Sequence, residues 1–182
     1  MNSRRHFLEQ GRLGFLAALA LPMSAFAGDE LAFEGLIIND QEGEAVRMRT
    51  GPAVVKIKMA KTQGAQSMCF LSESFMPGDA LPVHKHSNED ELVFLHKGSG
   101  LYTLGEKQYP ISEGAAIFIP KGVWHGLQNT GTENIEMRFA FSPAGFEGFF
   151  REVGTPVGQP FVQKSMEERR AIAKKWGMIY KA

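Results

Sequence analysis

The stretch that decides the fold is GDALPVHKHSNEDELVFLHKG, residues 78–98. It holds three potential metal ligands, His84, His86 and Glu91, within eight residues. Side chains on a β-strand alternate between its two faces, so two histidines separated by one residue point the same way. Glu91 follows a polar turn of four residues and opens the next apolar run. The pattern predicts two adjacent strands that carry two imidazoles and one carboxylate toward a common interior.

Other polar residues in this stretch are alternatives to that set. Glu89 and Asp90 could replace Glu91 as a ligand, but both fall in the polar turn, whereas Glu91 begins the strand. His96 has the opposite strand parity from Glu91, so its side chain is expected to face outward.

A fourth candidate ligand is His125, in PKGVWHGLQN further along the chain. In a sheet that closes into a barrel, a later strand can bring it to His84, His86 and Glu91. Imidazole nitrogens and carboxylate oxygens bind divalent ions at about 2.0–2.2 Å. Three imidazoles and one carboxylate without a thiolate suit Fe, Mn, Ni, Co or Cu better than a structural Zn site. The sequence therefore predicts one divalent transition metal, with Zn also open.

The composition fits one domain with an appendage in a chain of 182 residues. From Pro52 onward, short β-like runs alternate with turn signals, which predicts seven to nine strands over roughly 90 residues and an antiparallel sandwich or barrel. The formal net charge is +0, which argues against a nucleic-acid partner. Cys69 is the only cysteine, so an intrachain disulfide is impossible.

With these residues in place, the sequence resembles the cupin superfamily. The first cupin motif, G-x5-H-x-H-x(3,4)-E-x6-G, and the second, G-x5-P-x-G-x2-H-x3-N, are both matched at every pattern position. The matching residues are Gly78, His84, His86, Glu91 and Gly98, then Gly114, Pro120, Gly122, His125 and Asn129. The motifs span residues 78–129, and the resemblance extends from about Pro52 to Phe141. It implies an all-β, antiparallel jelly-roll barrel with His84, His86, Glu91 and His125 as metal ligands.

The segment SPAGFEGFFREVG, which follows the barrel, is similar to that of small single-domain cupins related to quercetin dioxygenase. This resemblance implies a dioxygenase that uses O2 on an enol, catechol or flavonol-like small molecule, with Glu91 as both ligand and proton acceptor. Two alternatives stay open. One is a cupin that binds a small ligand or a metal without turnover. The other, ranked lower because Arg138 is the one cation expected near the ligands, is a germin-type Mn enzyme directed at oxalate or superoxide.

Aromatic residues are expected around the metal. Phe94, Phe118 and Phe139 are candidates for an apolar interior near the pocket, while Phe75 or Trp124 could contact an aromatic substrate or simply pack.

Two helices are expected after the barrel. The first has an apolar stripe that includes Phe146 and Phe149, expected mainly to pack on the core, with Ser142 as its N-cap. The second begins with Ser165 and Glu168 as a capping box and ends at Gly177.

Residues 1–27 have the features of a secretory signal peptide: a positive start, the apolar run LGFLAALAL and the small-x-small triplet AFA at residues 25–27. The run is too short for a membrane span, and cleavage is expected after Ala27. SRRHFL, with Arg4 and Arg5, resembles the twin-arginine signal, which implies export of the folded protein to the periplasm by the twin-arginine machinery.

This route bears on the metal, because protein N/O sites favour Cu and Zn over Mn and Fe. Folding around the metal before export would avoid that competition, so Fe or Mn is favoured. The predicted organisation is a signal peptide (1–27), an N-terminal arm (28–51), the cupin barrel (52–141) and a helical extension (142–182). The arm could pack on a neighbouring copy, which predicts a homodimer.

Overall fold

The computed structural model describes residues 35–182. The predicted signal peptide and the start of the predicted arm lie outside the described residues. Within the described part there are two α-helices, α1 (Glu147–Val153) and α2 (Met166–Lys175), and one short 3-10 helix, η1 (Lys61–Gln63). The strands are β1 (Glu44–Arg47), β2 (Val55–Met59), β3 (Cys69–Phe75), β4 (Ala80–His86), β5 (Asp90–Lys97), β6 (Ser99–Leu104), β7 (Lys107–Ser112), β8 (Ala116–Ile119), β9 (His125–Gln128), β10 (Ile135–Ser142), β11 (Thr155–Pro156) and β12 (Met178–Tyr180).

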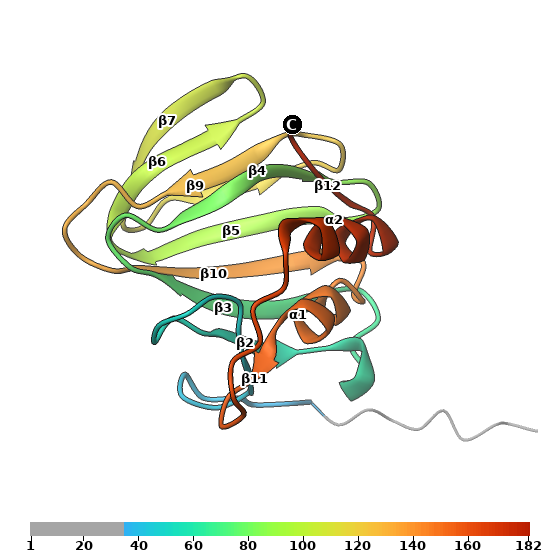
Figure 1. Cartoon of the computed structure of the whole chain (residues 1–182). Helices are drawn as coiled ribbons and strands as arrows, with labels where there is room; N and C mark the ends of the chain where they lie inside the picture. Colours follow the sequence, from blue (N-terminus) through green and yellow to red (C-terminus); the bar gives the residue numbers. More distant parts are fainter. Residues whose placement is uncertain (1–34) are drawn as a thin grey trace, which may run out of the picture. The chain divides into compact units, whose positions relative to one another are not determined.

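The strands form two antiparallel sheets (Figure 1). One has seven strands in the order β11-β1-β2-β3-β10-β5-β8, and the other has five in the order β12-β4-β9-β6-β7. Strands adjacent in sequence, such as β4 and β5, lie in different sheets, as in a jelly roll. The predicted all-β antiparallel jelly roll with C-terminal helices is therefore confirmed.

The core lies between the sheets because the strands alternate in character. In β10, Ile135, Met137, Phe139 and Phe141 are buried, and the residues between them are partly exposed. Their partners on β3 have the same inward parity, and Phe139 faces Leu71 across the ladder. Burying these side chains contributes about 1.5–3 kcal/mol each, so the inward rows of the two sheets supply most of the stabilisation.

The part of the chain before Pro52 contributes to the large sheet. β1 falls inside the segment predicted to be an arm and pairs with β2 on one side and β11 on the other. None of the helices within residues 35–182 combines the length and apolar character that crossing a membrane requires.

The first helix begins later than the sequence predicted, and Ser142 is not its cap. Ser142 ends β10, and its hydroxyl donates to the Ser67 carbonyl at 2.9 Å. Gly145 has a φ of 133°, a conformation that an α-helix cannot contain, so the helix starts only after it. The Glu147 carboxylate satisfies the chain there by accepting from the Gly145 N–H at 2.7 Å.

The second helix has the capping box predicted from its sequence. The Glu168 N–H donates to Ser165 Oγ at 3.1 Å, and the Ser165 N–H donates to Glu168 Oε2 at 2.7 Å. Gly177 follows the helix with a φ of 75° and redirects the chain into β12. This short strand was not predicted, and it pairs with β4 directly beside the histidines: Met178 lies opposite His86, and Tyr180 lies opposite His84.

The two helices contact each other on one side of the strands (Figure 1). Gly148 of α1 faces the indole of Trp176, which follows α2, and a Cβ at Gly148 would lie 2.0 Å from Trp176 Cη2. The Trp176 Nε1–H donates to Glu152 Oε2 at 2.8 Å. The glycine therefore permits α2 and β12 to dock against α1.

We expect Gly148→Ala to lower the free energy of unfolding by about 1–3 kcal/mol, because a methyl group must displace the packed indole. Thermal and urea unfolding measure the change. Gly35→Ala is the control, since its Cβ would meet no heavy atom within 4 Å. Equal stability of the Gly148 variant and the wild type would contradict the close packing of α1 and α2.

Candidate metal centre

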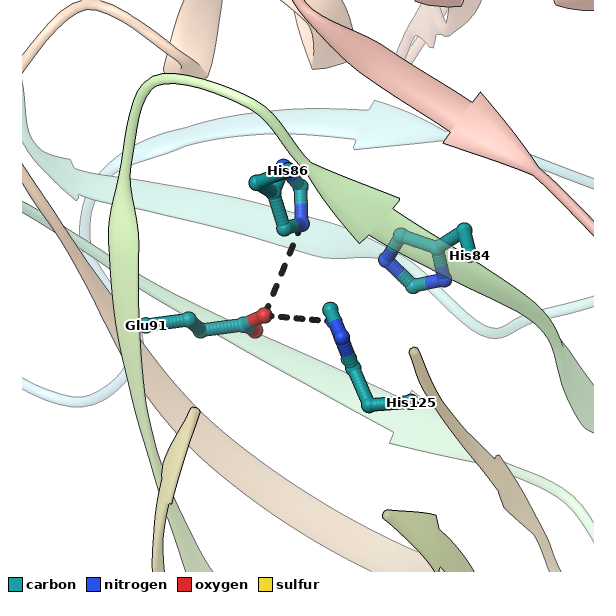
Figure 2. Close-up of side chains that lie close together, drawn as sticks. All are labelled: His84, His86, Glu91 and His125. Atoms are coloured by element: carbon teal, nitrogen blue, oxygen red, sulfur yellow. Dashed lines mark ion pairs between the residues drawn. The ribbon is translucent and has the colours of Figure 1, made fainter. Parts of the chain in front are cut away.

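Four buried side chains from both sheets converge at one point (Figure 2). His84 and His86 come from β4, and His125 is the first residue of β9, which pairs with β4 in the small sheet. Glu91 comes from β5 in the large sheet. One nitrogen or oxygen atom from each of the four lies within 4.8 Å of those of the others. The structure thus brings together the four residues that the sequence analysis selected.

The remaining candidates in the same stretch lie apart from this cluster. Asp90 accepts a hydrogen bond from the Lys121 N–H at 2.9 Å, which holds the turn before β5. Glu89 is buried but is not part of the group. His96 is exposed, as its strand parity predicted.

Backbone carbonyls orient two of the imidazoles. His84 Nδ1 lies 2.8 Å from the Pro82 carbonyl oxygen, and His125 Nδ1 lies 3.0 Å from that of Val123. Because a carbonyl can only accept, each Nδ1 carries the hydrogen, which leaves the lone pair of the neutral ring on Nε2. This is the arrangement in which a second hydrogen bond fixes the tautomer of a metal-binding histidine.

The centre contains buried polar atoms that lack hydrogen-bond partners among the described residues. These atoms are both ring nitrogens of His86, Nε2 of His125 and Oε2 of Glu91. Glu91 Oε2 lies 2.9 Å from His125 Nε2 and 3.5 Å from His86 Nε2 (Figure 2). Leaving such groups unsatisfied costs about 1–3 kcal/mol each. A divalent cation would satisfy His86 Nε2, His125 Nε2 and Glu91 Oε2 at once. The residues therefore fit a metal.

The histidines differ in how readily they take up a proton. Burial, followed by the nearby His125, lowers the pKa of His84 to about 3. Burial and then His84 and His125 lower the pKa of His86 to about 2. Both imidazoles are therefore neutral at ordinary pH, which is the form that binds metals.

His125 behaves differently because it faces Glu91. Burial opposes its charge most strongly, but the adjacent Glu91 carboxylate, with the Val123 carbonyl, outweighs burial and raises the pKa of His125. A metal ion at the centre would have to displace the proton that His125 carries when its ring is charged.

A cavity of about 280 Å³ adjoins the four residues, three of which line it: His84, His86 and Glu91. One wall consists of phenylalanines, Phe139 and Phe141 of β10 with Phe146, Phe149 and Phe150 at α1. The Phe146 ring centroid lies 4.4 Å from that of His86. The phenylalanine stripe of the first helix, expected mainly to pack, both packs and lines the cavity.

Some aromatic predictions were wrong. Phe94 and Phe118 are 42% and 60% exposed on the outer face of the large sheet, because their parity is opposite to that of Glu91. Phe139 does line the cavity, and Phe75 and Trp124 do not, so of their two expected roles packing is the one that fits. Arg138 also lies elsewhere and pairs with Asp40 at 2.7 Å.

Other cavity residues escaped the sequence analysis. Glu73 and Arg49 line the cavity, as do Met178 and Tyr180 of β12. Glu73 had a usable signal, because it shares strand parity with the buried Leu71 in CFLSESF. Arg49 lies in an irregular segment and β12 has only three residues, so neither carries a periodic pattern.

Residues 71–141 match the family model described as Cupin domain. This segment of the chain is therefore similar to a cupin domain. The matched segment contains all four residues of the centre, and it excludes α1, α2 and β12.

Relatives of known name match the barrel. The oxalate-binding protein of Thermotoga maritima is 27% identical over 108 residues, which cover 56% of this chain and 89% of that protein. Among solved structures, KdgF from Halomonas sp. has a TM-score of 0.56 at 18% identity and covers 63% of this chain and 99% of its own. The polyketide cyclase RemF from Streptomyces resistomycificus has a TM-score of 0.53 at 15% identity, covering 75% and 92%. These two structural likenesses concern the fold alone.

We expect His84→Ala to reduce metal affinity by more than about 100-fold, since even residues that only hold a ligand in place change affinity about 10–100-fold. Metal content after dialysis, measured by mass spectrometry, checks this. His96→Ala is the matched control, because that histidine is exposed on β5. Full retention of metal by the His84 variant would contradict this assignment of the centre.

Proposed function

We propose that this protein is an exported, metal-dependent dioxygenase that acts with O2 on an enol, catechol or flavonol-like small molecule. The observation that carries the proposal is the buried set of three histidines and one glutamate opening onto a cavity with a phenylalanine wall. In this proposal His84, His86, Glu91 and His125 hold one divalent ion, with Fe or Mn favoured.

A bound ion in such a site supplies Lewis acidity and orients oxygen-bearing substrates. The protein's own residues do the rest. Glu91 lines the cavity as well as the centre, so its carboxylate is placed to take the proton of a substrate hydroxyl. Phe141 and Phe146 pack against His86 and keep water from that side of the centre. An aromatic substrate would stack or pack edge-on against the same wall.

The second candidate is a non-catalytic binding cupin in the periplasm. It is favoured by the similarity to the Thermotoga maritima oxalate-binding protein, whose length is almost fully covered. In that case the cavity would hold a small ligand at the metal without turnover.

Oxygen uptake distinguishes the two candidates. We expect the Fe- or Mn-loaded protein to consume O2 with a member of a panel of flavonols, catechols and β-diketones, and Glu91→Ala to lower the rate by about 100-fold or more. Glu113→Ala is the control, because that carboxylate is exposed and outside the centre. Tight ligand binding with no uptake across the panel would favour the binding protein.

We also propose that the twin-arginine machinery exports the folded protein and that cleavage follows Ala27. The support is the SRRHFL sequence and the apolar run after it. Folding before export would let Fe or Mn enter without competition from Cu or Zn. A periplasmic homodimer is part of the same proposal.

Changing both Arg4 and Arg5 to lysine is expected to retain the precursor in the cytoplasm of a host that has this route, because the receptor reads the arginine pair. Cell fractionation with detection of the cleaved and uncleaved chain is the measurement. Arg12→Lys keeps the pair and should export normally. Normal export of the double variant, or only Cu or Zn in the natively exported protein, would refute the proposed route or its role in metal choice.

A further inference from the structure

A second polar cluster lies in the same cavity as the metal centre. Glu73 of β3 and Arg49, which lies between β1 and β2, both line the cavity. One terminal nitrogen of Arg49 pairs with Glu73 Oε1, and the other, Nη1, lies 3.0 Å from Asp79 Oδ2. The Arg49 guanidinium carbon also lies 4.8 Å from the centroid of the Phe75 ring. The arginine is thereby fixed from three sides, and it fixes Glu73 in turn.

The cluster and the metal centre lie at different levels of the barrel. β10 pairs with both β3 and β5, so positions on these two strands can be compared along it. Glu91 on β5 is opposite Phe141, and Glu73 on β3 is opposite Met137. Four residues along a strand separate the two backbone positions by about 13 Å. The side chains reach toward each other, because the charge of Glu91 adds to the burial that raises the pKa of Glu73. Phe139 lies between these two levels on β10 and also lines the cavity. The cavity is therefore lined by polar groups at two levels of the barrel and by an aromatic wall.

Glu73 has unused capacity to accept a hydrogen bond. Its side chain is only 7% exposed, and among the described residues Arg49 is its one hydrogen-bond donor, through Oε1. Its second oxygen has no hydrogen-bond donor among the described residues, and Glu73 lines the cavity. A carboxylate can accept at both oxygens. A ligand that supplies an O–H there would satisfy a carboxylate already withdrawn from bulk water.

The charges of the cluster favour a neutral donor over an anion. Both terminal nitrogens of Arg49 are occupied by carboxylates, so its planar fork is not free for a ligand carboxylate. Arg169 is the other cation that lines the cavity, and one of its terminal nitrogens donates to the Met48 carbonyl. A ligand carboxylate placed beside Glu73 would meet a like charge.

We propose that Glu73 determines specificity by accepting a hydrogen bond from a hydroxyl at the end of the ligand that lies away from the metal centre. The ligand class is then an elongated aromatic compound with metal-binding oxygens at one end and a neutral hydroxyl at the other. The inference rests on the proposed function for the end that meets the metal, and Glu73 has no part in holding the ion.

The test measures binding without turnover. Three probes are titrated anaerobically into the Mn-loaded protein: a flavonol with one para hydroxyl on its B ring, the methyl ether of that hydroxyl, and the parent flavonol without it. All three carry the same chelating end, and only the first can donate at the far end. We expect the wild type to bind the hydroxyl probe about tenfold more tightly than the methyl ether, as for a hydrogen bond to a charged acceptor.

Two variants distinguish recognition of the ligand hydroxyl by Glu73 from a general effect of disturbing the Arg49 ion pairs. Glu73→Gln keeps the size and removes the charged acceptor, so the preference is expected to fall below about threefold. Asp79→Asn is the matched control, because Asp79 holds the same arginine from outside the cavity. That variant should keep the preference. Metal content is measured in both and is expected to equal that of the wild type.

Retention of the hydroxyl preference in Glu73→Gln, or its equal loss in Asp79→Asn, would overturn the assignment of Glu73. Failure of all three probes to bind the wild type would overturn it as well. Oxygen uptake is recorded separately with the same proteins. Selective binding of the hydroxyl probe without O2 uptake would refute the dioxygenase proposal and support the role of Glu73. O2 uptake without selective binding would support the dioxygenase proposal and refute the role of Glu73.

Discussion

Polar atoms withdrawn from water must find partners, and in this protein that requirement acts where the two sheets meet. His84, His86 and His125 come from the small sheet, and Glu91 comes from the large one. Their inward atoms lie within 4.8 Å of one another. Those of His86, Glu91 and His125 have no hydrogen-bond partner among the described residues. Buried groups of this kind persist only where something compensates for lost hydration. A cation at the junction would therefore act as a cross-link between sheets as well as a chemical centre.

Two parts of the chain surround the four side chains: the barrel strands and the segment that follows the barrel. Strands β4, β5, β9 and β10 belong to the barrel and set the positions of the histidines, the glutamate and the first phenylalanines. The chain that follows the barrel then covers the cavity, with α1 supplying more phenylalanines and β12 supplying Met178 and Tyr180. The hydrogen bond from the Ser87 N–H to the Gly177 carbonyl, at 2.8 Å, joins the two parts beside the centre.

The sequence predicted the barrel and the convergence of the four residues because both depend on local alternation and on two spaced motifs. The same alternation correctly turned His96 outward, but it was not applied to Phe94 and Phe118, which it would have placed on the outer face. Ser142 was misjudged as a cap because the positive φ of Gly145 is a property of the folded chain. Glu73 shares strand parity with Leu71, but a glutamate between serines is more usual on a surface, so its charge argued against the inward position that its parity indicates.

The sequence did not predict several of the residues that line the cavity from outside the barrel motifs. A strand of three residues shows no periodicity, and the pairing of Tyr180 with His84 joins positions far apart in the chain. Arg49 reaches the cavity from an irregular segment whose path depends on its partners Glu73 and Asp79. Long-range contacts of this kind are tertiary outcomes, so they cannot be derived from one window of sequence.

The end of the cupin-like segment at residue 141 has a consequence for the cavity. All four residues of the centre lie before it, whereas Phe146, Phe149 and the whole of β12 lie after it. Substitutions after residue 141 can therefore change the shape of the cavity without altering any of the four converging side chains. The chemistry of the four side chains and part of the choice of ligand are thus located in separate parts of the chain.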